Sequence, residues 1–138
     1  MFKEIDSFAS VVRPSPKVSQ IHFGGGTPTF LTDPQIAKVL DKLKQYFVLD
    51  MSGEREFSIE IDPRGFTASR AKAYGEEGVT RASIGVQDFD ADVQKAIHRI
   101  QPFEMVEKTV DALRKNGVMS INFDLIYGLP HQTEKTII

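Results

Sequence analysis

The chain has 138 residues, 17 basic and 19 acidic side chains, a net charge of −2 and a pI near 5.9. Its 41% hydrophobic and 26% charged residues are typical of one globular domain, and the charge balance offers no basic stripe for nucleic acid or anionic membranes. No apolar run approaches the roughly 20 residues of a membrane span, and no secretory signal precedes the first strand, so we expect a cytoplasmic protein. Cysteine is absent, which excludes disulfides and thiolate metal sites within this chain.

The chain alternates between short apolar segments and segments with helical periodicity. Residues 1–17 are predicted to form a helix remnant followed by a linker. The predicted strands are residues 18–23, 57–61, 82–86 and 120–126, and the predicted helices are residues 34–47, 67–77, 91–97 and 103–116, with another helix beginning after Thr133. Thr32 and Gln35 are spaced as a capping box at the start of the first of these helices. Strands that alternate with helices predict an α/β fold with a parallel sheet.

Polar residues stand at the carboxyl ends of the predicted strands. Glu60 and Asp62 end the second strand, Gln87 ends the third, and Asp124 lies late in the fourth. The carboxyl ends of parallel strands meet at one edge of a sheet, which is where ligands bind in such folds. These residues therefore predict one shared site for a small molecule.

A glycine triplet, residues 24–26, follows the first predicted strand and precedes Thr27 and Pro28. Such a triplet suits either a flexible turn or a loop whose exposed backbone binds a ligand. Pro28 favours the second interpretation, because proline fixes its own φ and restricts the residue before it. The spacing matches neither a dinucleotide fingerprint nor a P-loop.

Arg99 follows the short third helix, and its planar guanidinium is suited to holding a carboxylate. Taken alone, it would be interpreted as a surface arginine. The segment 62–64 is interpreted as a structural turn at a strand exit. The three histidines, His22, His98 and His131, lack ligand-like spacing, and no metal site is predicted from them.

Six segments together resemble a known family. They are residues 24–29 (GGGTPT), 58–63 (SIEIDP), 85–89 (GVQDF), 93–94 (VQ), 99–101 (RIQ) and 124–130 (DLIYGLP). In order and spacing, over nearly all of residues 18–134, they are similar to the oxygen-independent coproporphyrinogen III oxidases, which are radical S-adenosylmethionine (SAM) enzymes. Asp88 after Gln87 favours the oxidases over the related haem chaperones, which tend to carry serine there.

The resemblance implies a TIM-like partial (β/α)6 barrel, with residues 1–138 as a fragment of the radical SAM core domain. Residues 18–138 would supply about four βα units of it. It also implies that Gly25, Gly26 and Thr27 line the methionyl group of SAM and that Arg99 pairs with its carboxylate. Three further residues would bind polar parts of the cofactor, with the last two suited to the ribose: Glu60, Gln87 and Asp124. No catalytic residue and no metal ligand is assigned within the chain.

Members of the family hold a [4Fe–4S] cluster with a Cys-x3-Cys-x2-Cys run placed before the first strand, and this sequence has no cysteine. The resemblance therefore implies an inactive piece of a parent enzyme. With a tetrapyrrole substrate and an electron donor, that parent would carry out the radical oxidative decarboxylation of coproporphyrinogen III to protoporphyrinogen IX in haem biosynthesis. A radical-SAM-like haem chaperone and a plain α/β binding module remain the alternatives. Open barrel edges predict self-association of the chain.

Overall fold

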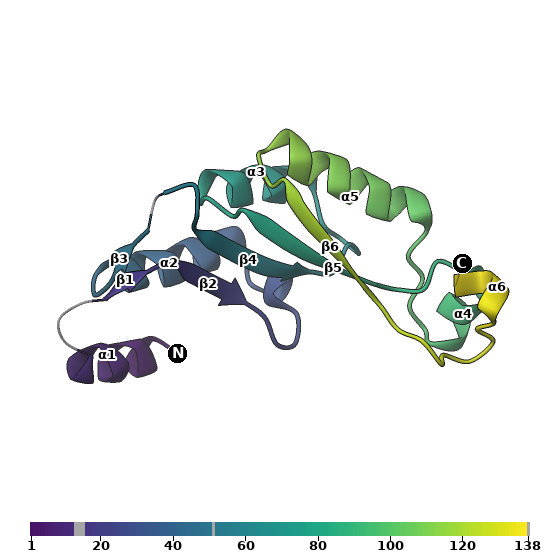
Figure 1. Ribbon diagram of the computed structural model, residues 1–138, viewed down its shortest axis with the longest axis horizontal. Helices are drawn as coiled ribbons and strands as arrows, with labels where there is room; N and C mark the ends of the chain where they lie inside the picture. The colour runs from purple at the N-terminus through teal and green to yellow at the C-terminus, as the bar shows by residue number, and fades with distance from the viewer. Residues whose placement is uncertain (13–15, 51, 138) are drawn as a thin grey trace.

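A four-stranded parallel sheet organises the chain (Figure 1). The computed structural model describes residues 1–12, 16–50 and 52–137. The strands lie in the order β2 (Gln20–Phe23), β4 (Glu56–Ile61), β5 (Arg81–Gln87) and β6 (Ser120–Leu125), and each neighbouring pair is parallel. The predicted α/β fold with a parallel sheet is confirmed.

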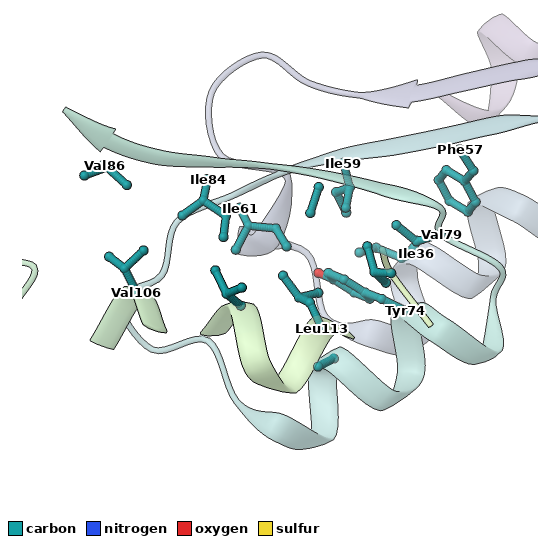
Figure 2. Packing of buried hydrophobic residues seen from close by; sticks show 14 of the residues in the cluster. Ile36, Phe57, Ile59, Ile61, Tyr74, Val79, Ile84, Val86, Val106 and Leu113 are labelled. Carbon is teal, nitrogen blue, oxygen red and sulfur yellow. The ribbon is translucent and has the colours of Figure 1, made fainter. Parts of the chain in front are cut away.

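Three helices cover one face of this sheet (Figures 1 and 2): α2 (Asp33–Lys44), α3 (Ala68–Glu76) and α5 (Phe103–Lys115). The remaining helical elements are α1 (Phe2–Val11), η1 (Pro28–Phe30), α4 (Ala91–Ala96) and α6 (Glu134–Ile137). Helix α1 has no buried residue and is held to α2 by Asp6, which lies 2.6 Å from both Lys42 Nζ and the Tyr46 hydroxyl. Among the described residues, no helix has the length and apolar character needed to cross a bilayer.

The core lies between the sheet and these helices (Figure 2). Alternate residues of the two central strands point into it: Phe57, Ile59 and Ile61 from β4, and Ala82, Ile84 and Val86 from β5. The helices contribute Ile36, Leu40, Ala71, Tyr74, Val106, Val110 and Leu113. Because successive side chains of a strand alternate between faces, the intervening polar residues of β4 and β5 all lie on the opposite face. The sheet is therefore apolar on its helix-covered face and polar on the other.

The first predicted strand is interrupted, and the first long helix ends earlier than the sequence predicts. The predicted strand 18–23 is divided at Ser19 into β1 (Lys17–Val18) and β2, and β1 pairs with β3 (Val48–Leu49), which sequence reasoning missed. Helix α2 ends at Lys44 rather than Phe47, because the amides of Tyr46 and Phe47 both bond to the Leu43 carbonyl and turn the chain. A two-residue strand is too short to show a period of two.

The ends of three helices are set by a capping residue or by a glycine. The Thr32 amide donates to Gln35 Oε1 at 2.8 Å, and this bond is the glutamine half of the predicted capping box. Gly78 and Gly117, which follow α3 and α5, adopt φ values of +84° and +88°. These left-handed positions end the two helices and return the chain to β5 and β6.

Strand β6 forms an exposed edge of the sheet. It pairs with β5 alone among the described strands, and Phe123, Leu125, Ile126 and Tyr127 are 45%, 59%, 46% and 89% exposed. An unpaired strand edge beside exposed apolar side chains favours pairing with another chain.

We predict that the chain self-associates through this edge. Analytical ultracentrifugation at rising concentration should show a shift from monomer toward larger species, and Leu125→Lys should reduce it because a charge at the edge opposes pairing. The matched control, Val11→Lys on exposed helix α1, should leave self-association unchanged. A wild-type chain that stays monomeric at high concentration would contradict the prediction.

Candidate functional site

A cavity of about 150 Å³ lies at the carboxyl edge of the sheet. It is lined by Gly26, Thr27, Pro28, Glu60, Ile61, Asp62, Gly85, Gln87, Arg99 and Asp124. All the residues predicted from the sequence except Gly25 line it, and the Gly25 amide donates to Glu60 Oε2 at 3.3 Å. The structure thus brings the predicted residues together at one edge.

The glycine loop is shaped by two different constraints. Gly25 and Gly26 adopt φ values of +80° and +66°, which side-chain-bearing residues rarely tolerate. Gly24 has no positive φ, but a β-carbon there would collide with His22 Nε2 and lie 2.9 Å from Glu60 Oε1. Backbone conformation therefore favours glycine at positions 25 and 26, whereas a side chain at position 24 would require the His22 ring and the Glu60 carboxylate to move.

The exit of this loop is fixed from the helical side by Arg70 of α3. Its guanidinium donates to the carbonyls of Thr29 and Leu31, at 2.5 Å each, and pairs with Asp33 at 2.9 Å. Pro28, which begins η1, is buried. These contacts favour a held loop over the flexible turn that the sequence left open.

Gln87 reaches the cavity through a strained backbone. Its φ is +71°, and the Asp88 amide bonds across it to the Val86 carbonyl at 2.9 Å. The register with β6 shifts at this point, since Gly85 pairs with Asp124 but Gln87 pairs with Leu125. Bulges and positive φ values at non-glycine residues concentrate where a side chain must be aimed at a ligand.

Arg99 is held by several acceptors around the end of β5. Helix α4 is followed by His98, which adopts a left-handed conformation (φ +55°) and returns the chain toward the sheet. Arg99 Nε donates to Gln101 Oε1 at 3.0 Å, and Nη2 donates to the Gly85 carbonyl at 3.1 Å. Among the described residues, these two nitrogens make the hydrogen bonds of the guanidinium, so Nη1 is available to a ligand.

Two buried glutamines support this arginine, and sequence reasoning gave them no role. Gln101 is fully buried, and its Nε2 donates to the carbonyls of Gly85 and Val86 at 3.0 and 2.8 Å. Gln94 Nε2 donates to the carbonyls of Asp88 and Gln101 at 2.9 Å each, and its Oε1 accepts from the Gln101 amide at 2.8 Å. Buried polar side chains must be paired, and here the pairing binds the loop 88–101 to the end of β5.

Asp62 belongs to the cavity as well as to the turn that the sequence assigned it. The turn is present, because the Arg64 amide donates to Asp62 Oδ1 at 2.9 Å and Arg64 Nη2 donates to Oδ2 at 2.7 Å. Asp62 Oδ2 also lies 3.6 Å from Arg99 Nη2. Asp62 therefore serves both the turn that was interpreted from the sequence and the cavity that its place at the strand end predicts. The signal was its position two residues after Glu60, which places both side chains on one face.

Several arginines control the ionisation of Asp62. Burial alone would raise the pKa of this carboxyl group, but hydrogen bonds from Arg64 and the positive charges of Arg99 and Arg64 outweigh burial. The pKa of Asp62 is consequently lowered from its ordinary value, and the group stays ionised beside Arg99 at neutral pH.

Asp124 is oriented by two polar residues that precede it on the open face of the sheet, Ser83 and Asn122. Ser83 Oγ lies 3.0 and 2.9 Å from its two carboxylate oxygens, and Asn122 Nδ2 donates to Oδ1 at 3.2 Å. The carboxylate keeps further lone pairs for a ligand hydroxyl.

Asp88 connects the loop after β5 to the turn after β6. This buried carboxylate accepts from the Asp90 amide at 2.6 Å and from Gln132 Nε2 at 2.5 Å. Gln132 also donates to the Ile126 carbonyl and accepts from the Leu129 amide. A serine at position 88 would be too short to keep both contacts.

The comparison with protein families gives a match over residues 2–138 to the model of the radical SAM superfamily. The chain belongs to the radical SAM superfamily. Within it, the chain is homologous to oxygen-independent coproporphyrinogen III oxidases. It is 48% identical over 133 residues to the oxidase of Helicobacter pylori, covering 96% of this chain and 29% of that protein. It is 50% identical over 131 residues to the oxidase of Bradyrhizobium diazoefficiens, covering 94% of this chain and 28% of that protein.

A solved radical SAM structure supports the same assignment. Coproporphyrinogen III oxidase of Escherichia coli matches with a TM-score of 0.90 and 38% identity, over 99% of this chain and 31% of that one. The chain thus spans less than a third of the length of these relatives. The predicted partial-barrel architecture is confirmed by this match.

Radical SAM proteins use SAM together with a [4Fe–4S] cluster, and the residues fit only the first. The sequence contains no cysteine, and the described part of the chain holds no group of three metal-ligating side chains. This chain therefore does not supply a site for the cluster. In contrast, carboxylates, amides, an arginine and glycine amides around one cavity match the charged and hydroxyl groups of SAM.

We predict that Asp62→Asn lowers stability at neutral pH but has little effect in acid. The ionised Asp62 contributes stability above its ordinary pKa of about 4, and this is lost as the pH falls through the lower folded pKa. Urea unfolding should show the variant less stable by about 1 kcal/mol near neutral pH, with the difference shrinking as the pH falls through the lowered folded pKa of Asp62. Asp111→Asn on exposed α5 is the control. A wild-type-to-variant difference that is constant across pH would contradict the assignment.

Proposed function

We propose that this chain is the SAM-binding part of a radical SAM enzyme of the oxygen-independent coproporphyrinogen III oxidase type. The parent would convert coproporphyrinogen III to protoporphyrinogen IX by radical oxidative decarboxylation in porphyrin biosynthesis, using a tetrapyrrole substrate and an electron donor. The identity to curated oxidases supports the substrate class. The observation that carries the proposal is the convergence of the glycine loop and four polar side chains on one cavity: Glu60, Gln87, Arg99 and Asp124.

Each side chain suits a different part of SAM. Arg99, already fixed by Gly85 and Gln101, would bind the methionyl carboxylate through its remaining N–H groups. Glu60, whose Oε2 accepts from the Gly25 amide, would face the methionyl ammonium beside the loop. Asp124 and Gln87 lie on adjacent strands. Asp124 would accept hydrogen bonds from the ribose hydroxyls, and the amide of Gln87 would donate to them or accept from them.

The chain's contribution is binding and orientation rather than bond cleavage. Bound SAM and a reduced cluster supply the hydrogen-abstracting chemistry that acts on the propionate side chains of the substrate. With no cysteine in its sequence, this chain alone is expected to be inactive, and the thiolates would come from the parent outside these 138 residues. Its pre-formed carboxylate and arginine positions would fix the orientation of the amino-acid end of SAM.

The proposal predicts weak but site-specific binding of SAM to this chain. Without the cluster as an anchor for the methionyl group, we expect a dissociation constant of roughly 0.1–1 mM. In an NMR titration, amide shifts should concentrate at residues 24–27, 60, 87 and 124. Arg99→Lys should weaken binding about tenfold, because lysine cannot present the planar fork, whereas Arg114→Lys on exposed α5 should not.

Tight binding without a cluster, or equal effects of Arg99→Lys and Arg114→Lys, would contradict the proposal. The activity of the parent requires a separate assay. The cluster-reconstituted full-length protein should form protoporphyrinogen IX from coproporphyrinogen III under anaerobic conditions. Haem transfer without decarboxylation would instead identify a haem chaperone, and failure to bind SAM would leave a plain α/β binding module.

A further inference from the structure

His22 lies directly beneath the glycine loop, and the functions discussed so far give it no role. It is the penultimate residue of β2, between Ile21 and Phe23, which pack against the core. Its own side chain is 58% exposed on the open, polar face of the sheet. The imidazole of His22 therefore lies on the same face of the sheet as Glu60, Gln87 and Asp124.

Both ring nitrogens of His22 have partners on the neighbouring strand β4. Nδ1 lies 2.8 Å from Ser58 Oγ, whose residue is the cross-strand partner of His22. Nε2 lies 3.5 Å from Glu60 Oε1. Ser58 Oγ also lies 3.4 Å from the Ile21 carbonyl as a donor, so the direction of its bond with Nδ1 depends on the ring tautomer; with the proton on Nε2, the ring donates toward the Glu60 carboxylate.

The same carboxylate extends this contact to the loop. Glu60 Oε1 faces the imidazole, while Oε2 accepts from the Gly25 amide at 3.3 Å. The imidazole also occupies the space that a side chain at position 24 would need, and Glu60 Oε1 borders the same space. The ring, the carboxylate and the glycine loop are thus packed as one unit.

We propose that His22 is a positioning residue that holds Glu60 against the glycine loop in the geometry that accepts the methionyl group of SAM. It acts through Glu60 and does not itself touch the ligand. Ser58 has the supporting function of fixing the orientation of the ring through its contact with Nδ1. The contacts run from Ser58 to His22 to Glu60, as in a catalytic triad. Ser58 is nevertheless not placed as a nucleophile, because it is 7% exposed and faces the ring. The inference that the ligand is SAM rests on the proposed function. The contacts from His22 through Glu60 to the Gly25 amide are present without a ligand.

Two substitutions of His22 separate its two contacts. The amide nitrogen of glutamine reaches the position of Nε2, whereas that of asparagine reaches only the position of Nδ1. His22→Gln therefore keeps the donor to Glu60, and His22→Asn keeps the contact with Ser58 alone. Gln20→Asn, an exposed residue two positions earlier on β2, is the matched control.

The experiment records the Gly25 amide resonance of the intact chain by NMR without ligand, and then follows a titration with SAM. We expect His22→Asn to shift this amide and to weaken SAM binding about fivefold. His22→Gln should stay within about twofold of wild type, and Gln20→Asn should match wild type. In a Glu60→Ala background, His22→Asn should have no further effect, because the side chain that His22 contacts is already absent.

Equal loss in His22→Asn and His22→Gln, or an unmoved Gly25 amide in His22→Asn, would overturn the positioning role. The Gly117 amide, at the opposite end of the sheet, reports on folding and should be unchanged in every variant. If wild-type protein fails to bind SAM, the proposed function fails, but the Gly25 resonance in the ligand-free variants still decides the role of His22.

Discussion

Parallel pairing of four strands is the constraint on which the rest of this structure depends. Because β2, β4, β5 and β6 all run in one direction, their carboxyl ends meet at a single edge, and each contributes a polar residue or loop there. The strands alternate apolar and polar residues, so the helices cover the core face and leave the other face to polar networks. Reversing any one strand would remove its residue from the site.

The site is held mainly by hydrogen bonds to backbone carbonyls at the strand ends. Gln101 and Arg99 both donate to the Gly85 carbonyl. Arg70 donates to the carbonyls of Thr29 and Leu31, which follow Pro28. Such contacts position ligand-binding groups before a ligand arrives, which lowers the entropic cost of binding. The strained φ of Gln87 is preceded by bonds to the carbonyls of Gly85 and Val86, which hold the chain at this point.

Much of this arrangement follows from the sequence, for identifiable reasons. Alternating strand and helix periods indicate the parallel sheet, and polar residues at strand ends indicate its ligand edge, so Glu60, Gln87 and Asp124 were predicted without coordinates. Short-range patterns do not reveal partners distant in sequence. The support of Arg70 for the loop after Pro28 joins residues about 40 positions apart, and β3 is a pair of residues without a period. Asp62 shows the related difficulty that one side chain can serve both a turn and a cavity.

The most direct test of the account is a crystal structure of this chain with S-adenosylhomocysteine, a stable analogue of SAM that lacks the sulfonium methyl group. The account predicts that the amino-acid carboxylate of the ligand lies within hydrogen-bonding distance of Arg99, its amino group lies beside Glu60, and its ribose hydroxyls lie against Asp124. A ligand bound instead in the outer groove between α3 and α5, or one that leaves these three side chains without contact, would contradict it.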